Sequence, residues 1–229
     1  MLIAEKIARI EERILNACIS AGRKREEITL MGVTKFEAAE KIEEAFRCGI
    51  RCFGESRVKE AAGKFELFKS SHPDVNLHLI GALQRNKAKQ AALLFDCIQS
   101  VDRNELIDEL NKYPRPQKGA LAVLLELHTG EESKGGYADL DALFFAAESA
   151  LRAGNLKPAG LMTMAPFTED KDLIRSSFRL LVKAQKELEK RFAHDNHWDV
   201  LSMGMSNDFE IAVEEGSTLL RIGSAIFKE

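Results

Sequence analysis

Eight short apolar runs, all but the last followed by a stretch with helical periodicity, constrain the fold of this chain more than any other feature. The runs are rich in Val, Ile, Leu and Phe and cover residues 28–34, 50–54, 77–81, 97–101, 120–127, 159–163, 200–203 and 219–223. The helical stretches lie near 38–48, 56–69, 84–94, 103–112, 138–153, 171–192 and 207–215. Because both faces of the runs are apolar, they are typical of strands in a parallel sheet that helices cover.

Eight strands can close a (β/α)8 barrel, and the chain's 229 residues come near the ~250 typical of such barrels. An open doubly wound sheet is the alternative, but no G-x-G-x-x-G motif follows the first run, where a dinucleotide-binding fold has it. No linker or break in composition divides the chain. We therefore predict an α/β fold, a TIM-type (β/α)8 barrel that forms a single domain over residues 1–229.

The first 22 residues predict an extra helix before the first strand. Ile3, Ile7, Ile10 and Ile14 are four, three and four residues apart, so they form one apolar stripe. Only six residues follow Gly223, which is too few for a full helix after the eighth strand. We expect the N-terminal helix to fill the gap that this leaves in the outer ring.

Charge and hydropathy exclude two classes of surface. Lys and Arg total 33, and Asp and Glu total 36, which gives a formal net charge of −3. This balance argues against a broadly basic nucleic-acid surface and against a polybasic membrane anchor. No apolar run approaches the ~18 residues of a membrane span, so we expect no membrane contact and a cytoplasmic location.

Neither the cysteines nor the histidines predict a metal site. The four cysteines have no C-x-x-C spacing, which favours buried thiols in a reducing compartment, and Cys48 and Cys52 lack further ligands for zinc. His194 and His197 are three residues apart, a spacing that can place two imidazoles on one metal. They precede a strand, opposite the strand ends, and a solvated loop explains them better.

In a barrel, functional residues gather where strands end and βα loops begin. Lys35 directly follows the first strand, in MGVTKF, so it is expected at the mouth. A solvated strand end explains an isolated lysine there. The functional alternative is a nucleophilic amine that forms an imine with a carbonyl, which requires burial or a nearby cation to lower its pKa.

The last two strand ends, in LSMGMSND and LLRIGSAIF, carry glycines and small hydroxyl residues. Barrels commonly hold a phosphate on the loops after strands seven and eight. Gly204 and Gly223 would allow backbone N–H groups to approach it closely, although both glycines are also explained as strand terminators. An amine and a phosphate cradle in the same mouth suggest pyridoxal phosphate.

Further motifs lie along nearly the whole chain. They are CFGESRVKE from Cys52, HLIGALQRNKAK from His78, QSVDR from Gln99, TGEESKGG from Thr129 and GLMTMAP from Gly160. Together with MGVTKF and the two C-terminal loops, and in this order, they resemble the pyridoxal phosphate homeostasis proteins, also called the proline synthase co-transcribed bacterial homologue family. These proteins are single-domain relatives of the barrel half of alanine racemase, so the resemblance implies an alanine racemase N-terminal-domain-like barrel.

The resemblance also implies roles for individual residues. Lys35 would carry the internal aldimine with pyridoxal 5′-phosphate, and Ser56 would lie beside the cofactor. The phosphate would be held, largely through backbone donors, by Ser202, Met203, Gly204, Gly223 and Ser224. Arg221 would face the pyridine nitrogen, while His78 and Met162 would line the mouth. A permanently charged guanidinium disfavours a protonated pyridinium, so we expect modest carbanion chemistry.

The sequence departs from the family pattern at two places. The family usually reads G-E-N-Y after strand two, whereas residues 54–57 read Gly-Glu-Ser-Arg, so the hydroxyl of Ser56 replaces a side-chain amide. Glu37 stands where members often have a second lysine, while Lys87 and Lys134 fall where the family carries lysines. Cofactor transfer through position 37 is therefore in doubt, whereas binding is expected to survive.

The function that the resemblance implies is intracellular buffering of pyridoxal phosphate, with delivery to apo forms of pyridoxal phosphate-dependent enzymes, by a monomer without substantial catalysis. The alternative is an amino-acid racemase of the alanine racemase type. Such racemases take a tyrosine base from an added domain of a partner subunit, and the tyrosines here are Tyr113, below strand five, and Tyr137, which could approach the mouth. A regulatory protein that senses the cofactor is a third possibility.

Overall fold

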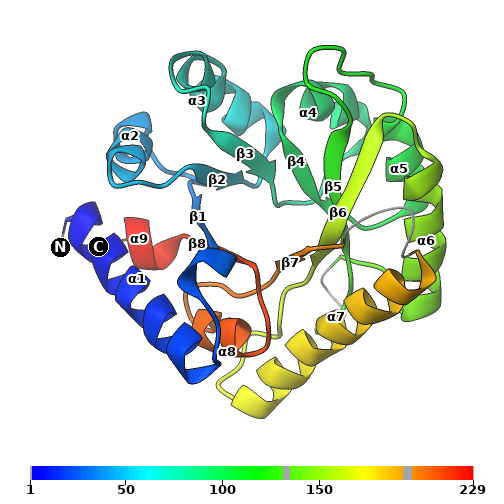
Figure 1. The fold of residues 1–229 in the computed structure, drawn as a ribbon. Helices are drawn as coiled ribbons and strands as arrows, with labels where there is room; N and C mark the ends of the chain where they lie inside the picture. The colour runs from blue at the N-terminus through cyan, green and yellow to red at the C-terminus, as the bar shows by residue number, and fades with distance from the viewer. Residues whose placement is uncertain (1, 131–134, 193–197, 229) are drawn as a thin grey trace.

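The structure, a computed structural model, describes residues 2–130, 135–192 and 198–228. Eight parallel strands form a closed barrel in which each strand pairs with its sequence neighbours and β8 pairs with β1 (Figure 1). They are β1 (Thr29–Val33), β2 (Cys52–Glu55), β3 (Asn76–Leu79), β4 (Cys97–Val101), β5 (Leu121–Glu126), β6 (Leu156–Met162), β7 (Val200–Ser202) and β8 (Leu219–Ile222). The predicted barrel is confirmed, and the open sheet is excluded.

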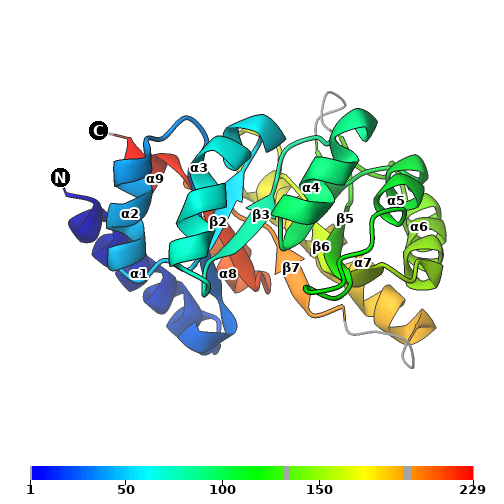
Figure 2. The same cartoon turned by 90° about the horizontal axis from the view of Figure 1, so that it is seen from above.

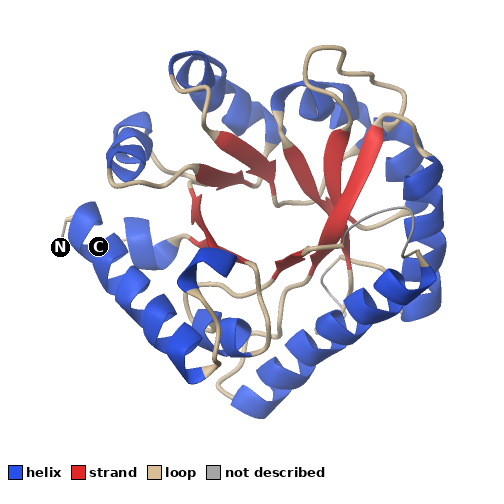
Figure 3. Ribbon diagram, viewed as in Figure 1, coloured by secondary structure: helices blue, strands red, loops and turns tan. Residues whose placement is uncertain are grey.

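The helices surround the strands, as the colouring of Figure 3 makes plain. They are α1 (Ile3–Ser20), α2 (Ala39–Arg47), α3 (Val58–Ser71), α4 (Ala88–Leu94), α5 (Asn104–Leu110), α6 (Leu140–Arg152), α7 (Lys171–Arg191), α8 (Phe209–Glu214) and α9 (Ser224–Phe227), with 3-10 turns η1 (Arg25–Glu27) and η2 (Arg85–Lys87). Within the described residues, no helix has the length and apolar character that crossing a bilayer requires.

Strand β6 begins three residues earlier than the predicted run at 159–163. Lys157 and Pro158 hid this start, because lysine is depleted in strands and proline cannot donate to a ladder hydrogen bond. The pairing of β5 with β6 shifts register just there, between Val123 and Leu124, so the proline lies at an irregularity of the ladder. Such irregularities are where sheets tolerate proline.

Helix α1 closes the outer ring, as predicted. Its stripe of Ile3, Ile7, Ile10 and Ile14 is buried, with at most 7% of each residue exposed. The helix packs against α8, α9 and α2, so the two ends of the chain lie side by side (Figures 1 and 2). At about 1.5–3 kcal/mol for each buried isoleucine, this stripe gives the helix a substantial part of its docking free energy.

The barrel has a large apolar layer between strands and helices and a smaller, mixed interior. The interior apolar side chains fall into two small clusters, one of Met31, Val33, Cys52 and Leu219 and the other of Cys97, Leu124 and Met162. The barrel also holds buried polar side chains: His78, Gln99, Glu126, Ser202 and Arg221. The polar groups need internal partners, because unsatisfied buried groups are costly.

Candidate functional site

A cavity of about 780 Å3 opens at the carboxyl ends of the strands. The ends of all eight strands, or the loops that follow them, contribute to its described lining. This volume falls within the range of ~300–1,000 Å3 that is typical of small-molecule sites, and the carboxyl-terminal face is where barrels carry their active sites. We therefore take this cavity as the candidate functional site.

The cavity brings together half of the residues that the sequence nominated. Lys35, Ser56, Arg221, Gly223 and Ser224 line it, from the ends of β1, β2 and β8. The other nominated residues do not belong to its lining: His78, Met162, Ser202, Met203 and Gly204. Five of the nominated residues thus share one cavity, whereas the other five lie deeper or face outward.

The loop after β7 presents different residues to the cavity than the sequence suggested. The buried Ser202 hydroxyl donates to Gln99 Oε1 at 2.6 Å, and the N–H of Met203 donates to the carbonyl of Leu219 at 3.2 Å. A Cβ at Gly204, where φ is +95°, would lie 2.5 Å from the Cβ of Ala212. Glycine at 204 is therefore required for the packing of α8.

A group of backbone donors does face the cavity. Ser206 and Asn207 after β7, with Gly223 and Ser224 after β8, line one wall. Among the hydrogen bonds of the described residues, none uses the backbone N–H of these four positions. The Ser206 hydroxyl accepts a hydrogen bond from the N–H of Ala225 at 3.2 Å, which ties the two loops together. Clustered, unused N–H groups are a suitable site for an anion.

The charge of the cavity wall is nearly balanced. Among its described residues, three are cationic, Lys35, Arg221 and Lys228, and the acidic ones are Glu37, Asp102, Glu126 and Asp208. No basic patch is present in this part of the chain to attract an anion at long range. An anion in this cavity would therefore depend on the local backbone donors.

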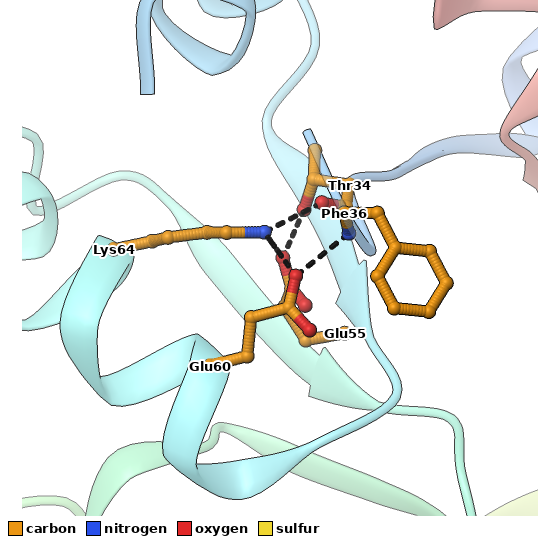
Figure 4. A network of polar contacts seen from close by, with 5 residues as sticks. All are labelled: Thr34, Phe36, Glu55, Glu60 and Lys64. Atoms are coloured by element: carbon orange, nitrogen blue, oxygen red, sulfur yellow. Dashed lines mark hydrogen bonds and ion pairs between the residues drawn. The ribbon is translucent and has the colours of Figure 1, made fainter. Parts of the chain in front are cut away.

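Lys35 is exposed at the rim, and its two neighbours in the chain are held in place (Figure 4). The Thr34 hydroxyl donates to Glu55 Oε1 at 2.7 Å, and the N–H of Phe36 donates to Glu60 Oε1 at 2.7 Å. Burial raises the pKa of Glu55, against the opposing effects of the Thr34 hydroxyl and the Lys64 ammonium. These contacts fix the peptide groups on both sides of Lys35.

Arg221 is held by a chain of hydrogen bonds that runs down the barrel interior. Its Nη1 donates to Ser202 Oγ at 2.6 Å, and Ser202 donates to Gln99 Oε1. Gln99 Nε2 and His78 Nδ1 are 2.7 Å apart, and His78 Nε2 lies 3.1 Å from Asn76 Oδ1. With the Gln99 amide as donor, His78 is the neutral tautomer that carries its proton on Nε2, which it donates to Asn76.

Two predicted mouth residues thus belong to the barrel interior. Burial lowers the pKa of His78 to about 4, so the ring is neutral near pH 7. Met162 is 1% exposed and packs against Cys97 and Leu124. The structure places neither side chain in the described cavity lining, because strand direction reveals which end is the mouth, but not how deep each inward side chain lies.

Glu126 is a cavity residue that the sequence argument overlooked. Burial, followed by the nearby Asp102 carboxylate, raises its pKa to about 7, while Arg221 opposes the shift. A Cβ at Gly135 would lie 3.2 Å from Asp102 Oδ2 and 3.8 Å from Glu126 Oε2, so both carboxylates approach this glycine. The signal was a charged residue near the end of the apolar run at 120–127, which the sequence argument did not use.

The comparisons with known proteins agree with this geometry. Residues 12–229 match the family model of the alanine racemase N-terminal domain. A protein of Aquifex aeolicus named pyridoxal phosphate homeostasis protein is 39% identical over 232 residues, which cover 100% of this chain and 99% of that protein. The chain belongs to this family.

Solved structures support the same assignment. PipY of Synechococcus elongatus PCC7942, solved with pyridoxal phosphate bound, is 30% identical, with a TM-score of 0.84 over 98% of this chain and 99% of that one. An alanine racemase of Clostridium difficile is 12% identical, with a TM-score of 0.73, and the match covers 96% of this chain but 59% of the racemase. The racemase likeness concerns the fold alone.

The positions where the homeostasis-protein pattern is broken lie in the cavity wall. Ser56 and Glu37 both line it, and Glu37 accepts a hydrogen bond from Lys41 Nζ at 2.8 Å. Lys87 is exposed on η2 and is not part of the described lining. Lys134, His194 and His197 lie outside the described residues. Within the described part, no group of three or more His, Cys, Asp or Glu side chains is placed to hold a metal ion.

Neither tyrosine belongs to the cavity lining. Tyr137 is buried in the apolar layer between strands and helices, and its hydroxyl donates to Asn104 Oδ1 at 3.2 Å. Tyr113 donates to Glu109 Oε1 at 2.8 Å. The expectation that Tyr137 could approach the mouth is not met, because its ring packs outward from the barrel.

Proposed function

We propose that this protein binds pyridoxal 5′-phosphate in the mouth of the barrel, with its aldehyde at Lys35, and thereby buffers the free cofactor. The observation that carries the proposal is that the amine of Lys35 and the unused N–H groups around Gly223 and Ser224 line the same cavity. A family relative with the cofactor bound adds support.

The residues present fit this cofactor. Its phosphate would meet the backbone donors of Ser206, Asn207, Gly223 and Ser224, which suit a multiply charged oxyanion. When bound, the cofactor supplies an aldehyde that condenses reversibly with an amine. Release to another amine then requires no hydrolysis, which suits buffering and delivery.

Arg221 determines the state of the ring end of the site. Burial lowers the pKa of this guanidinium to about 10, so it remains charged near pH 7. The side chain offers only donors, and two of them are committed, one to Ser202 Oγ and the other to the carbonyl of Thr163 at 2.8 Å. Beside a pyridine nitrogen, this cation would disfavour protonation, which weakens the ring as an electron sink.

We propose that the protein does not catalyse racemisation to a substantial extent. A racemase needs an acid or base on each side of the substrate carbon, and both tyrosines of this chain are committed elsewhere. We further propose a monomer that works in the cytoplasm and passes its cofactor to apo-enzymes. The unpaired state of the four cysteines supports a reducing compartment.

The proposal is tested by the absorbance spectrum of the purified protein with added pyridoxal phosphate. Wild type should show the visible band of a lysine-bound cofactor, and borohydride followed by peptide mapping should locate the modification on Lys35. Lys35→Ala should lose the band, whereas Lys228→Ala, which removes another cavity amine, should keep it. A band that persists in Lys35→Ala would contradict the role of this lysine.

The absence of racemisation has its own test. Alanine is incubated with the cofactor-loaded protein in heavy water, and deuterium at Cα is followed by NMR. We expect exchange no faster than with free pyridoxal phosphate at the same concentration. Rapid exchange that depends on the protein would favour the racemase alternative. Sedimentation of the loaded and unloaded protein checks the expected monomer.

A further inference from the structure

We propose that Lys64 of helix α3, together with Glu60 and Glu55, positions Lys35 for its reaction with the cofactor aldehyde. This inference rests on the proposed function, because it concerns how the chain holds the amine that carries it. Lys64 does not line the cavity, so it is a positioning residue rather than a group that touches the ligand.

Lys64 joins three separate elements at one point (Figure 4). Its Nζ donates to the Thr34 carbonyl at 2.8 Å, to Glu60 Oε1 at 2.7 Å and to Glu55 Oε1 at 3.1 Å. An ammonium has three N–H donors, and these three acceptors can use all of them. Its side chain is only 15% exposed, so water competes weakly for these donors.

The network of Lys64, Glu60 and Glu55 holds the chain by hydrogen bonds immediately before and after Lys35. Before it, Thr34 is held through its carbonyl by Lys64 and through its hydroxyl by Glu55. After it, the N–H of Phe36 is held by Glu60, which Lys64 orients. Among the described residues Lys35 has no comparable anchor of its own, so the geometry of its Cα depends on these neighbours.

The backbone conformation of Phe36 indicates that these contacts hold the chain in a strained conformation. Phe36 has a φ of +67°, the only positive φ among the described non-glycine residues. Bulky side chains rarely adopt this conformation, and it persists where surrounding contacts over-determine it. The Phe36 residue is 70% exposed, so the hydrogen bond from its N–H to Glu60 is the better explanation of the constraint.

A purely structural ion pair is the competing explanation, and the packing of α3 argues against it. The helix already buries Val58, Ala61 and Phe65, the last two completely. Glu55 is completely buried, and its Oε2 has no hydrogen-bond partner among the described residues. A chain that needed only to dock α3 would gain more from an apolar contact than from this incompletely satisfied carboxyl.

The test compares Lys64→Met with Lys59→Met, which removes an exposed lysine from the same helix. Each variant is titrated with pyridoxal phosphate and with pyridoxine 5′-phosphate, which has the same ring and phosphate but no aldehyde. We expect Lys64→Met to weaken binding of pyridoxal phosphate by about tenfold, since misplacing a reacting group costs one to two orders of magnitude. It should leave the affinity for pyridoxine 5′-phosphate within twofold of wild type, and Lys59→Met should change neither.

Two further variants, Lys64→Arg and Thr34→Val, test whether Lys64 acts through its charge and its contacts. Lys64→Arg retains a cation and should recover most of the lost affinity, and circular dichroism checks that each variant is folded. If Lys64→Met does not fold, Thr34→Val, which deletes only the hydroxyl that reaches Glu55, should show the same selective loss to a smaller degree.

Two outcomes would overturn the inference. If Lys64→Met weakened the binding of both ligands equally, Lys64 would have a structural role. If neither affinity changed, Lys35 would need no positioning. Failure of the proposed function looks different, because wild type would then bind no pyridoxal phosphate or Lys35→Ala would bind it as wild type does.

Discussion

The two sides of the cavity mouth are held by networks of opposite character. On the β1 side, the charged groups of Lys64 and Glu60 reach from α3 and hold the chain around Lys35 from outside the barrel. On the β8 side, Arg221 is held from inside the barrel, where Gln99 and its neighbours form a neutral relay. The barrel therefore fixes its amine and its guanidinium by independent means.

Burial explains why the networks differ. The side chains of Lys64 and Glu60 are 15% and 22% exposed, and their opposite charges are paired, which is how mostly buried charges are tolerated. The interior relay is almost sealed from Arg221 to His78 and ends at the exposed Asn76. Each neutral donor along it has one acceptor, in a single direction from Ser202 to Asn76. Removing one neutral member leaves the buried groups beside it without a hydrogen-bond partner, because water cannot replace it.

The largest effect should follow from breaking the interior relay. Gln99→Leu has nearly the same volume but leaves the Ser202 hydroxyl and His78 Nδ1 without their partner. Two stranded buried groups, at ~1–3 kcal/mol each, should lower the free energy of unfolding by about 4 kcal/mol, measured by urea denaturation. Gln84→Leu, at an exposed position, is the matched control and should change it little. A loss no larger than in this control would mean that the relay is not a constraint.

Two buried groups of the barrel interior should have opposite pH dependence. His78 has a pKa of about 4 when folded and 6.5 ordinarily, so it contributes stability above pH 6.5 that is lost as the pH falls to about 4. Glu126 has a pKa of about 7 when folded and 4.5 ordinarily, so its contribution is present below pH 4.5 and lost as the pH rises through about 7. Between pH 4.5 and 6.5 folding moves one proton onto Glu126 and one off His78, and the two effects cancel.

Glu126→Gln should therefore expose the His78 dependence. Its free energy of unfolding should rise by about 3 kcal/mol more than that of wild type between pH 4.5 and 6.5, at about 1.4 kcal/mol for each pKa unit. His78→Gln is the complementary variant and should show a fall of similar size over the same range. If the free energy of unfolding changed with pH in the same way in both variants and in wild type, the effects of His78 and Glu126 would not cancel.

Much of the fold was predictable because its signal is local. Both faces of each strand are covered, so apolar runs and helical stretches alternate along the chain, and the isoleucine stripe of α1 is periodic. The start of β6 was not predictable, because Pro158 is tolerated only at a register shift, which depends on the partner strand. Local patterns do not encode the pairing of distant residues.

The candidate site, like the fold, has residues that could be predicted from the sequence and residues that could not. Lys35, Gly223 and Ser224 could be placed because each follows a strand, and all strands of a barrel end at one mouth. The depth of Ser202 in the barrel depends on strand stagger, which no single run reveals. The Glu60–Lys64 pair has a visible i,i+4 spacing typical of a solvated helix face, and only the tertiary fold joins it to Thr34.

The outer network should tolerate damage better than the interior relay. Lys64→Met removes the cation from the buried Glu55, but burial already raises the pKa of this carboxyl, so it can take up a proton instead of remaining an unpaired charge. We expect a loss of about 2 kcal/mol in the free energy of unfolding, below the 3–5 kcal/mol typical of a broken buried ion pair. A loss above that of Gln99→Leu would reverse the comparison.

The smallest effect should come from the strained residue of the outer network. Phe36→Gly and Phe36→Ala both remove the exposed ring, but only alanine keeps the Cβ that disfavours a φ of +67°. Phe36→Gly should therefore unfold with a free energy about 1 kcal/mol higher than Phe36→Ala, because a left-handed conformation costs ~1–2 kcal/mol for residues with a Cβ, and glycine loses part of this gain through its freer unfolded chain. Equal stabilities would mean that the backbone relaxes once the ring is gone. Glu60 would then not hold Phe36 in place, and Lys35 would be positioned through Thr34 alone.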